Sequence, residues 1–284
     1  MSYWPLAGLA LIFCLVWGWN GLMIRHWDSV PVRLLTAIIP LPAVHVNGAT
    51  ITYHDLLQRK DVLRYLDGEN KNEDQLLASA TDVLIRQEAI AQIADKLHVE
   101  VTQEDSNAAL SKLQGERSRS DFFTEVKDKL QMNERTFIRE VVDPLALAQK
   151  LEKEVLASFE VQKVPRDTMV GVQARLAAGE SFSRLAEAYS DDFSAENGGD
   201  IGYVTAETIP EGWEALLTTP DGGVTNIIET ESSFVIAKVA WLVGSEANTE
   251  IRTQAIIVKK RTVNDVVEAF LATSTVREII HINR

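Results

Sequence analysis

The first stretch of the chain is apolar and uncharged. From Trp4 to Ile24 no side chain carries a charge, and tryptophans stand near both ends of this run. A helix of this length is about what is needed to cross the hydrocarbon core of a bilayer, and aromatic residues favour its interfaces. The pattern predicts a transmembrane anchor over residues 1–25. A proline-punctuated apolar connector over residues 26–44 is expected after it.

A cleaved signal peptide is the alternative interpretation of this segment. No basic region precedes the apolar run, and no small-x-small cleavage site directly follows it, so the anchor is favoured. Arg25 and Arg33 follow the span, and the positive-inside rule would place that side in the cytoplasm. The charge flanks therefore oppose the extracytoplasmic orientation considered below.

Helical periodicity dominates the next part of the chain. A short strand and turn, His45–Ile51, come first. Apolar residues then recur at helical spacing from Leu56 to Leu66 and from Leu76 to Leu97. A later helix is expected to kink at Pro144. The pattern predicts a mostly helical domain over residues 45–160, and a plain helical bundle would show the same apolar stripes.

The pattern changes again near Val164. Two amphipathic helices lead into a glycine-dense turn, Asn197–Gly202, which is followed by a short helix and a pair of β-rich runs. A last strand is expected over residues 251–260, before a terminal helix. The predicted fold class is α+β: residues 161–284 form an antiparallel sheet covered by helices.

Composition and charge narrow the function. The chain is 46% hydrophobic with a net charge of −13, and it shows no basic stripe with interleaved aromatics, which disfavours nucleic acid as a partner. The single Cys14 indicates no disulfide chemistry. The five histidines are scattered without metal-ligand spacing, so no metal is expected. No phosphate-binding glycine loop is found, and no cofactor is expected.

Residues 179–239 resemble the parvulin, or PpiC-type rotamase, family. The motifs that carry the resemblance follow in order: GESFSRLAEAYSDD, SAENGGDIGYV, IPEGWEALL and GGVTNIIETESSFVIAKV. Upstream, AVHVNGATITYHDLL and LIRQEAIAQIADKLHVEVTQED resemble the N-terminal chaperone segment of SurA/PrsA/PpiD-type foldases. The resemblance implies a chaperone domain joined to a peptidyl-prolyl isomerase domain. It also implies unfolded or proline-containing polypeptides as partners and a single-pass protein of the cell membrane that faces away from the cytoplasm.

Two departures from the family pattern stand out. The family opens this domain with an A-x-H-I-L-V strand, which here matches RTQAIIVKK near the C-terminus, so we infer a circularly permuted domain. The family also places two histidines together in the sheet. Their positions fall on Ala255 and Val235, and this double replacement is what an apolar repacking would produce.

Rotation about an X–Pro bond crosses a barrier of about 18–20 kcal/mol without breaking a bond. It needs no nucleophile or cofactor, only an apolar pocket, exclusion of water and a hydrogen-bond donor. The resemblance implies six site residues: catalytic Asp192, Thr230 and Ser232, and substrate-binding Ile201, Ile209 and Trp213. Each also has a plain structural interpretation, as core packing for the apolar residues or as loop and turn residues for the polar ones.

Three functions remain open at this point. The first is a membrane-anchored prolyl isomerase that assists the folding of extracytoplasmic proteins. The second is a non-catalytic holdase chaperone, because both family histidines are replaced. The third is a scaffold that uses the parvulin fold only to bind peptides.

Overall fold

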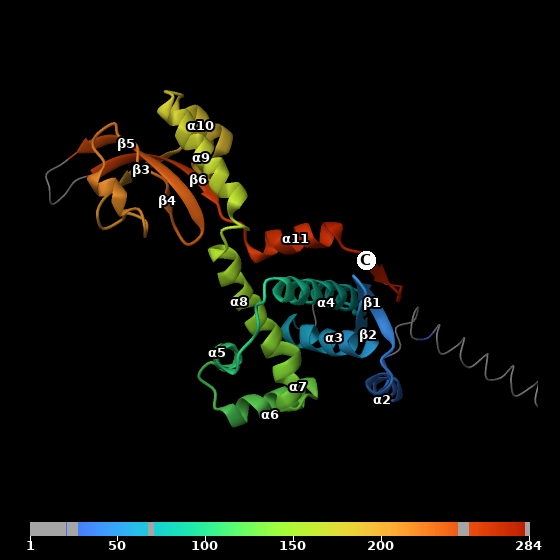
Figure 1. Cartoon of the computed structure of the whole chain (residues 1–284). Helices are drawn as coiled ribbons and strands as arrows, with labels where there is room; N and C mark the ends of the chain where they lie inside the picture. Colours follow the sequence, from blue (N-terminus) through green and yellow to red (C-terminus); the bar gives the residue numbers. More distant parts are fainter. Residues whose placement is uncertain (1–20, 22–27, 68–70, 244–249, 282–284) are drawn as a thin grey trace, which may run out of the picture. The chain divides into compact units, whose positions relative to one another are not determined.

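The computed structural model describes residue 21 and residues 28–67, 71–243 and 250–281. It divides into two compact units (Figure 1). Unit 1 comprises the residues up to Leu151 together with those from Asp265 onward, and unit 2 comprises Glu152–Asn264. The expected domain limits, 45–160 and 161–284, stay predictions. The structure adds that the residues from Asp265 pack with unit 1.

The described residues include no helix that is both long enough and apolar enough to span a bilayer. The longest helix described, α4, has 24 residues and carries charged side chains along its whole length. The anchor expected over residues 1–25 lies outside the described residues except for residue 21. The expected fold class with a transmembrane helix, and the expected single-pass membrane localisation, are therefore wrong for the part of the chain that the structure describes. That part is α+β, mostly helical with antiparallel sheets, and a membrane partner is not supported.

Unit 1 is built from helices around one small sheet. Asn47 and Gly48 have positive φ angles of 50° and 91°, as a tight hairpin turn requires, and they join β1 to β2. The C-terminal strand β7 pairs with the other edge of β1, giving the order β2-β1-β7. Two of the helices of this unit, α8 and α11, cross its boundary. Its elements are α2 (Val30–Ile38), β1 (Pro42–Val46), β2 (Ala49–Thr52), α3 (Tyr53–Asp67), α4 (Glu73–Lys96), α5 (Gln103–Gln114), α6 (Arg119–Leu130), α7 (Glu134–Phe137), the π-helical turn η2 (Ile138–Val142), α8 (Asp143–Ala157), α11 (Val263–Thr273) and β7 (Val276–Glu278).

The helices of unit 1 begin at polar caps that the sequence supplies. The Asn72 side chain accepts a hydrogen bond from the backbone of Gln75 at the start of α4, and Thr102 does the same with Asp105 at the start of α5. Two apolar cores lie in the unit, one around the small sheet, α3 and α4, and one around Phe122 and the helices near it. The helical character predicted for this part of the chain is confirmed.

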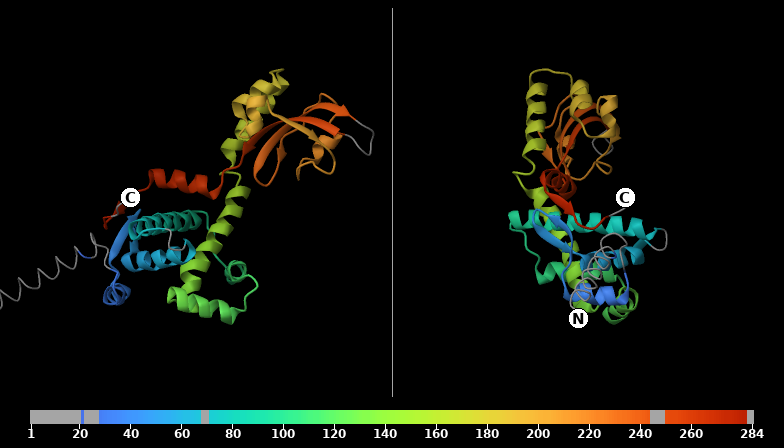
Figure 2. Two further views of the ribbon diagram at one scale, coloured as in Figure 1. Left: turned by 180° about the vertical axis from the view of Figure 1, so that it is seen from behind. Right: turned by 90° about the vertical axis from the view of Figure 1, so that its right-hand side faces the viewer.

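Unit 2 is a four-stranded antiparallel sheet of order β3-β6-β5-β4. β6, the last strand of this unit in sequence, therefore lies in the middle of the sheet, and Figure 2 shows it beside the antiparallel β5. The elements are α9 (Lys163–Ala177), α10 (Phe182–Tyr189), η3 (Phe193–Asn197), β3 (Asp200–Val204), η4 (Glu214–Thr218), β4 (Ile228–Glu229), β5 (Ser233–Val243) and β6 (Glu250–Lys259).

Alternation along β5 and β6 gives this sheet two apolar faces. Phe234, Ile236 and Ile256 pack on one face against α9 and α10. Val235 and Ala255 belong to the opposite face, which is covered by the segment that carries Trp213. Because successive side chains of a strand point to opposite sides, each strand contributes to both cores.

The end of β6 lies beside the start of α9. Gln162, which is 1% exposed, donates a 2.9 Å hydrogen bond to the carbonyl of Arg261 and accepts one of 2.8 Å from its backbone N–H. These bonds join two chain segments that would be consecutive if the domain opened with this strand. The arrangement supports the permutation inferred from the sequence.

Candidate functional site

The two positions matched to the family histidines lie on neighbouring central strands. Ala255 of β6 pairs with Ala237 of β5, and Val235 of β5 pairs with Ile257 of β6. Ala255 and Val235 are both 0% exposed and belong to the same apolar cluster. The sheet at this point is therefore packed with aliphatic side chains and has no imidazole at either position.

The three expected substrate-binding residues gather on this cluster. Trp213 is buried within it, with 6% of its surface exposed, while Ile201 and Ile209 are half-buried and pack against it. The structure thus brings together residues from β3, from the loop after β3 and from the start of η4. Ile201 and Ile209 retain the accessible surface that a proline ring could contact, whereas Trp213 mostly fills the core.

The turn that positions Ile201 requires a glycine. Gly199 has a φ of +81°, and a Cβ built on it would lie 2.4 Å from the carbonyl oxygen of Ala255. The backbone N–H of Ala255 also donates a 2.8 Å hydrogen bond to the carbonyl of Gly199. Only a residue without a side chain allows this approach, so Gly199 fixes β3 against β6.

Asp192, one of the expected catalytic residues, caps the short helix η3. Its Oδ2 accepts a 2.9 Å hydrogen bond from the backbone N–H of Ser194, at the start of η3. The adjacent Phe193 is 88% exposed. One carboxylate oxygen of Asp192 therefore stabilises the start of η3. The other makes no hydrogen bond within the described residues.

The residues before Asp192 attach this loop to β6. The Ser190 hydroxyl accepts a hydrogen bond from the backbone N–H of Ile257 at 3.1 Å, and Asp191 accepts one from that of Lys259 at 2.8 Å. The sequence pattern does not identify Ser190 and Asp191 as functional residues. Their position inside the motif AYSDD was the one available signal.

The two expected hydroxyl residues differ in their contacts. The Thr230 hydroxyl accepts a 3.0 Å hydrogen bond from the backbone N–H of Ser233 and lies 2.9 Å from the Ser233 hydroxyl, so it closes the turn between β4 and β5. Ser232 is exposed, and its hydroxyl has no hydrogen-bond partner within the described residues. Its carbonyl accepts a 2.8 Å bond from the N–H of Lys260. This turn and the Asp192 loop thus both adjoin the same end of β6.

Charged side chains border the sheet at both ends of β6. Burial alone would raise the pKa of Glu229, but a hydrogen bond from Lys260, together with the nearby Arg166, lowers it below its ordinary value. Hydrogen bonds from Arg252 and from the backbone of Gly202 lower the pKa of Asp200 on β3. No group of three or more potential metal ligands occurs in the described ranges.

A protein-family model matches part of unit 2. The model of the rotamase family, described as the PPIC-type PPIase domain, matches residues 153–240. The match ends before β6 begins at Glu250.

The curated relatives each match a segment of comparable length. SurA, a chaperone of Burkholderia pseudomallei, is 35% identical over 75 residues, which is 26% of this chain and 17% of SurA. The foldase PrsA of Oceanobacillus iheyensis is 40% identical over 70 residues, 24% of this chain and 23% of PrsA. The periplasmic chaperone PpiD of Buchnera aphidicola is 30% identical over 80 residues, 28% of this chain and 13% of PpiD. The matches thus span less than a quarter of each of these relatives. Residues 153–240 of this chain therefore match the PPIC-type peptidyl-prolyl isomerase domain, and the chain is similar over part of its length to SurA, PrsA and PpiD.

Proposed function

We propose that this chain is a protein-folding factor whose unit 2 catalyses the cis–trans isomerisation of X–Pro bonds in unfolded polypeptides. The observation that supports the proposal most is the apolar cluster on one face of the sheet, where Ile201, Ile209 and Trp213 meet. The match of residues 153–240 to the PPIC-type PPIase domain also supports the proposal.

In the proposed mechanism the proline ring rests on the exposed parts of Ile201 and Ile209. Contact with this apolar surface removes water from the amide, and the planar, conjugated ground state loses the solvation that favours it. The free hydroxyl of Ser232 is the donor that we assign to the substrate, because the Thr230 hydroxyl is engaged in its own turn. Asp192 would face the twisting carbonyl with the oxygen that does not cap η3.

The absence of imidazoles from Ala255 and Val235 changes what can contribute to the rate. Bond rotation needs no proton transfer, so burial of the substrate and one hydrogen bond can still lower part of the barrier of about 18–20 kcal/mol. A rate that depends on neither residue should not titrate near neutral pH, where histidine is the ordinary titrating side chain.

The alternative is a holdase that binds unfolded chains without accelerating isomerisation. The complete burial of Ala255 and Val235 favours it, because a repacked core under the site is also what an inactive domain would contain. The two functions separate in one experiment on the full chain. Exchange spectroscopy on a proline peptide measures isomerisation, while suppression of aggregation of an unfolded protein measures holding.

We expect Ser232→Ala and Ile209→Ala to lower isomerisation about tenfold or more. Ser232→Ala should leave the melting temperature close to that of the parent chain, because Ser232 is exposed. Ser232→Thr, which keeps the hydroxyl, is the matched control for the first variant. If the parent chain suppresses aggregation fully but does not accelerate isomerisation, the chain is a holdase and the proposed isomerase function is wrong.

A further inference from the structure

A proline shapes one wall of a cavity in unit 1. Pro144 has no backbone N–H to donate to the carbonyl of Glu140, four residues earlier, and the helix widens into the π-helical turn Ile138–Val142 at this point. Arg59 of α3 reaches the carbonyl instead, with an Nη2–O distance of 2.7 Å, and also donates to Gln87 of α4 at 3.0 Å. The kink expected at Pro144 thus takes the form of a wide turn, and such turns are frequent at functional sites.

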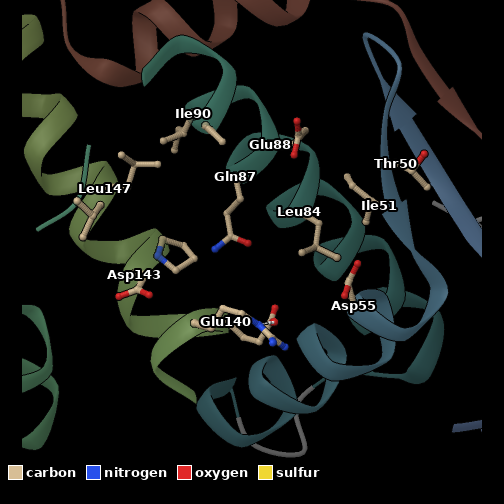
Figure 3. A pocket seen from close by; sticks show the side chains of 14 residues that line it. Thr50, Ile51, Asp55, Leu84, Gln87, Glu88, Ile90, Glu140, Asp143 and Leu147 are labelled. Atoms are coloured by element: carbon tan, nitrogen blue, oxygen red, sulfur yellow. Dashed lines mark hydrogen bonds and ion pairs between the residues drawn. The ribbon is translucent and has the colours of Figure 1, made fainter. Parts of the chain in front are cut away.

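A cavity of about 430 Å³ opens beside this turn (Figure 3). Its walls come from β2, α3, α4, η2 and the start of α8. Figure 3 shows Leu147 facing Ile90 across it and Leu84 projecting into it from α4. These aliphatic side chains are half-buried, so part of the surface of each remains accessible to a ligand. The volume lies within the usual range of about 300–1,000 Å³ for ligand sites.

Carboxylates line the same cavity from several sides. The hydrogen bonds that they make within the described residues occupy one oxygen of each: Asp55 with Thr52, Glu88 with Gln92, Glu140 with Arg139, and Asp143 with Ser106. The lining residues therefore include four carboxylates and one cation, Arg139. When the adjacent Arg59 is also counted, the cavity region carries a net charge of two negative charges. The second oxygen of each carboxylate remains available to a cationic ligand.

We propose that this cavity binds a polypeptide segment in which a lysine or arginine adjoins an aliphatic side chain. The aliphatic group would pack against Leu84, Ile90 and Leu147, and the cation would lie against the carboxylates. Burial of the aliphatic group supplies affinity, and the surplus negative charge selects the cationic neighbour over an acidic one. The site is separate from the isomerase domain and does not depend on its activity.

The test uses the full chain and short, fluorescently labelled peptides without proline, so that the isomerase domain is not probed. Fluorescence anisotropy is measured with a lysine–leucine peptide, a glutamate–leucine peptide and a lysine–serine peptide of equal length. We expect the lysine–leucine peptide to bind about tenfold or more tightly than the other two, and less tightly at high salt. Equal binding of the lysine and glutamate peptides would overturn the proposal.

Two variants, each with a matched control, test whether the peptide binds in this cavity. Ala91→Trp fills it from the exposed side of α4 and should abolish binding, while Ala108→Trp, on an exposed face of α5, should not. Glu88→Gln, which keeps the shape and the bond to Gln92, should weaken the lysine–leucine peptide about three- to tenfold. Glu116→Gln, outside the cavity, should leave it unchanged. Circular dichroism confirms that the variants are folded, and unchanged binding in folded Ala91→Trp would disprove the site.

Discussion

The carbonyl oxygen of Ala255 occupies the space that a side chain of Gly199 would need. A Cβ there would lie 2.4 Å from that oxygen, and the φ of Gly199 is +81°. Gly202 has a similar φ of +84°, but nothing lies within 4 Å of its Cβ position. The two glycines therefore separate the effect of backbone conformation from that of close approach.

We predict that Gly199→Ala destabilises unit 2 far more than Gly202→Ala. Backbone strain alone costs about 1 kcal/mol, which is the loss expected for Gly202→Ala. Gly199→Ala adds a clash with the backbone of β6, and we expect a loss of about 3 kcal/mol or more. Denaturant unfolding measures both values. Equal losses would show that the approach of β3 to β6 does not need a glycine.

The connection between α9 and the end of β6 can be tested through Gln162. Replacing it with alanine leaves the backbone N–H and carbonyl of Arg261 without these partners, at a cost of about 1–3 kcal/mol. Gln173→Ala, which removes only a 3.4 Å contact with Asn226, is the matched control and should cost less than about 0.5 kcal/mol. A loss in Gln162→Ala no larger than in the control would argue that the junction is not held by this side chain.

Arg59 and Pro144 should be coupled in stability. Arg59→Met removes the 2.7 Å hydrogen bond to the carbonyl of Glu140, at a cost of about 1–3 kcal/mol. In a Pro144→Ala background the restored N–H can satisfy that carbonyl, so the same substitution should cost less. A double-mutant cycle by denaturant unfolding measures the difference. Strict additivity would contradict the link between Pro144 and the π-helical turn.

The charged network of unit 1 predicts acid sensitivity. Burial alone would raise the pKa of Asp28, but hydrogen bonds from Arg33 and Lys60 lower it; the pKa of Glu73 is lowered in the same way, against burial, by Lys60 and Arg64. A carboxyl whose folded-state pKa is lowered stabilises the fold above its ordinary pKa, and this stabilisation is lost as the pH falls through the folded value.

We therefore expect the stability of unit 1 to be steady above about pH 5 and to fall below it. Arg33→Gln removes a partner of Asp28 and Asp61, so it should lower stability near neutral pH and make the acid dependence shallower. Urea unfolding at a series of pH values provides the measurement. An unchanged slope in the variant would exclude this network as the source.

How far the sequence predicts the structure differs between regions. The strand and turn at His45–Ile51 could be predicted because local turn chemistry decides them. The strand after residue 250 was expected from its apolar run and its resemblance to a displaced family strand. The pairing of β7 with β1 was not, because it joins residues more than two hundred positions apart and follows from tertiary packing.

The candidate site shows the same division. The resemblance suggested Ile201, Ile209 and Trp213 together, and the structure has them in one cluster. The tethering of the Asp192 loop by Ser190 and Asp191 could not be predicted, because it depends on backbone atoms of β6 that pattern analysis does not locate. The hydrogen bond that the Thr230 hydroxyl accepts from Ser233, and the lack of a partner for the Ser232 hydroxyl within the described residues, likewise depend on the geometry of one turn.

The central claim is that unit 2 accelerates rotation about X–Pro bonds. The most direct measurement is cis–trans exchange of a short proline peptide by two-dimensional NMR, with the full chain at substoichiometric concentration and at several pH values. We predict acceleration over the uncatalysed exchange, a rate that is flat between about pH 5.5 and 7.5 because Ala255 and Val235 cannot titrate, and loss of the acceleration in Ser232→Ala. No acceleration by a folded chain with any of several residues before the proline would contradict the claim and leave a peptide-binding domain without isomerase activity.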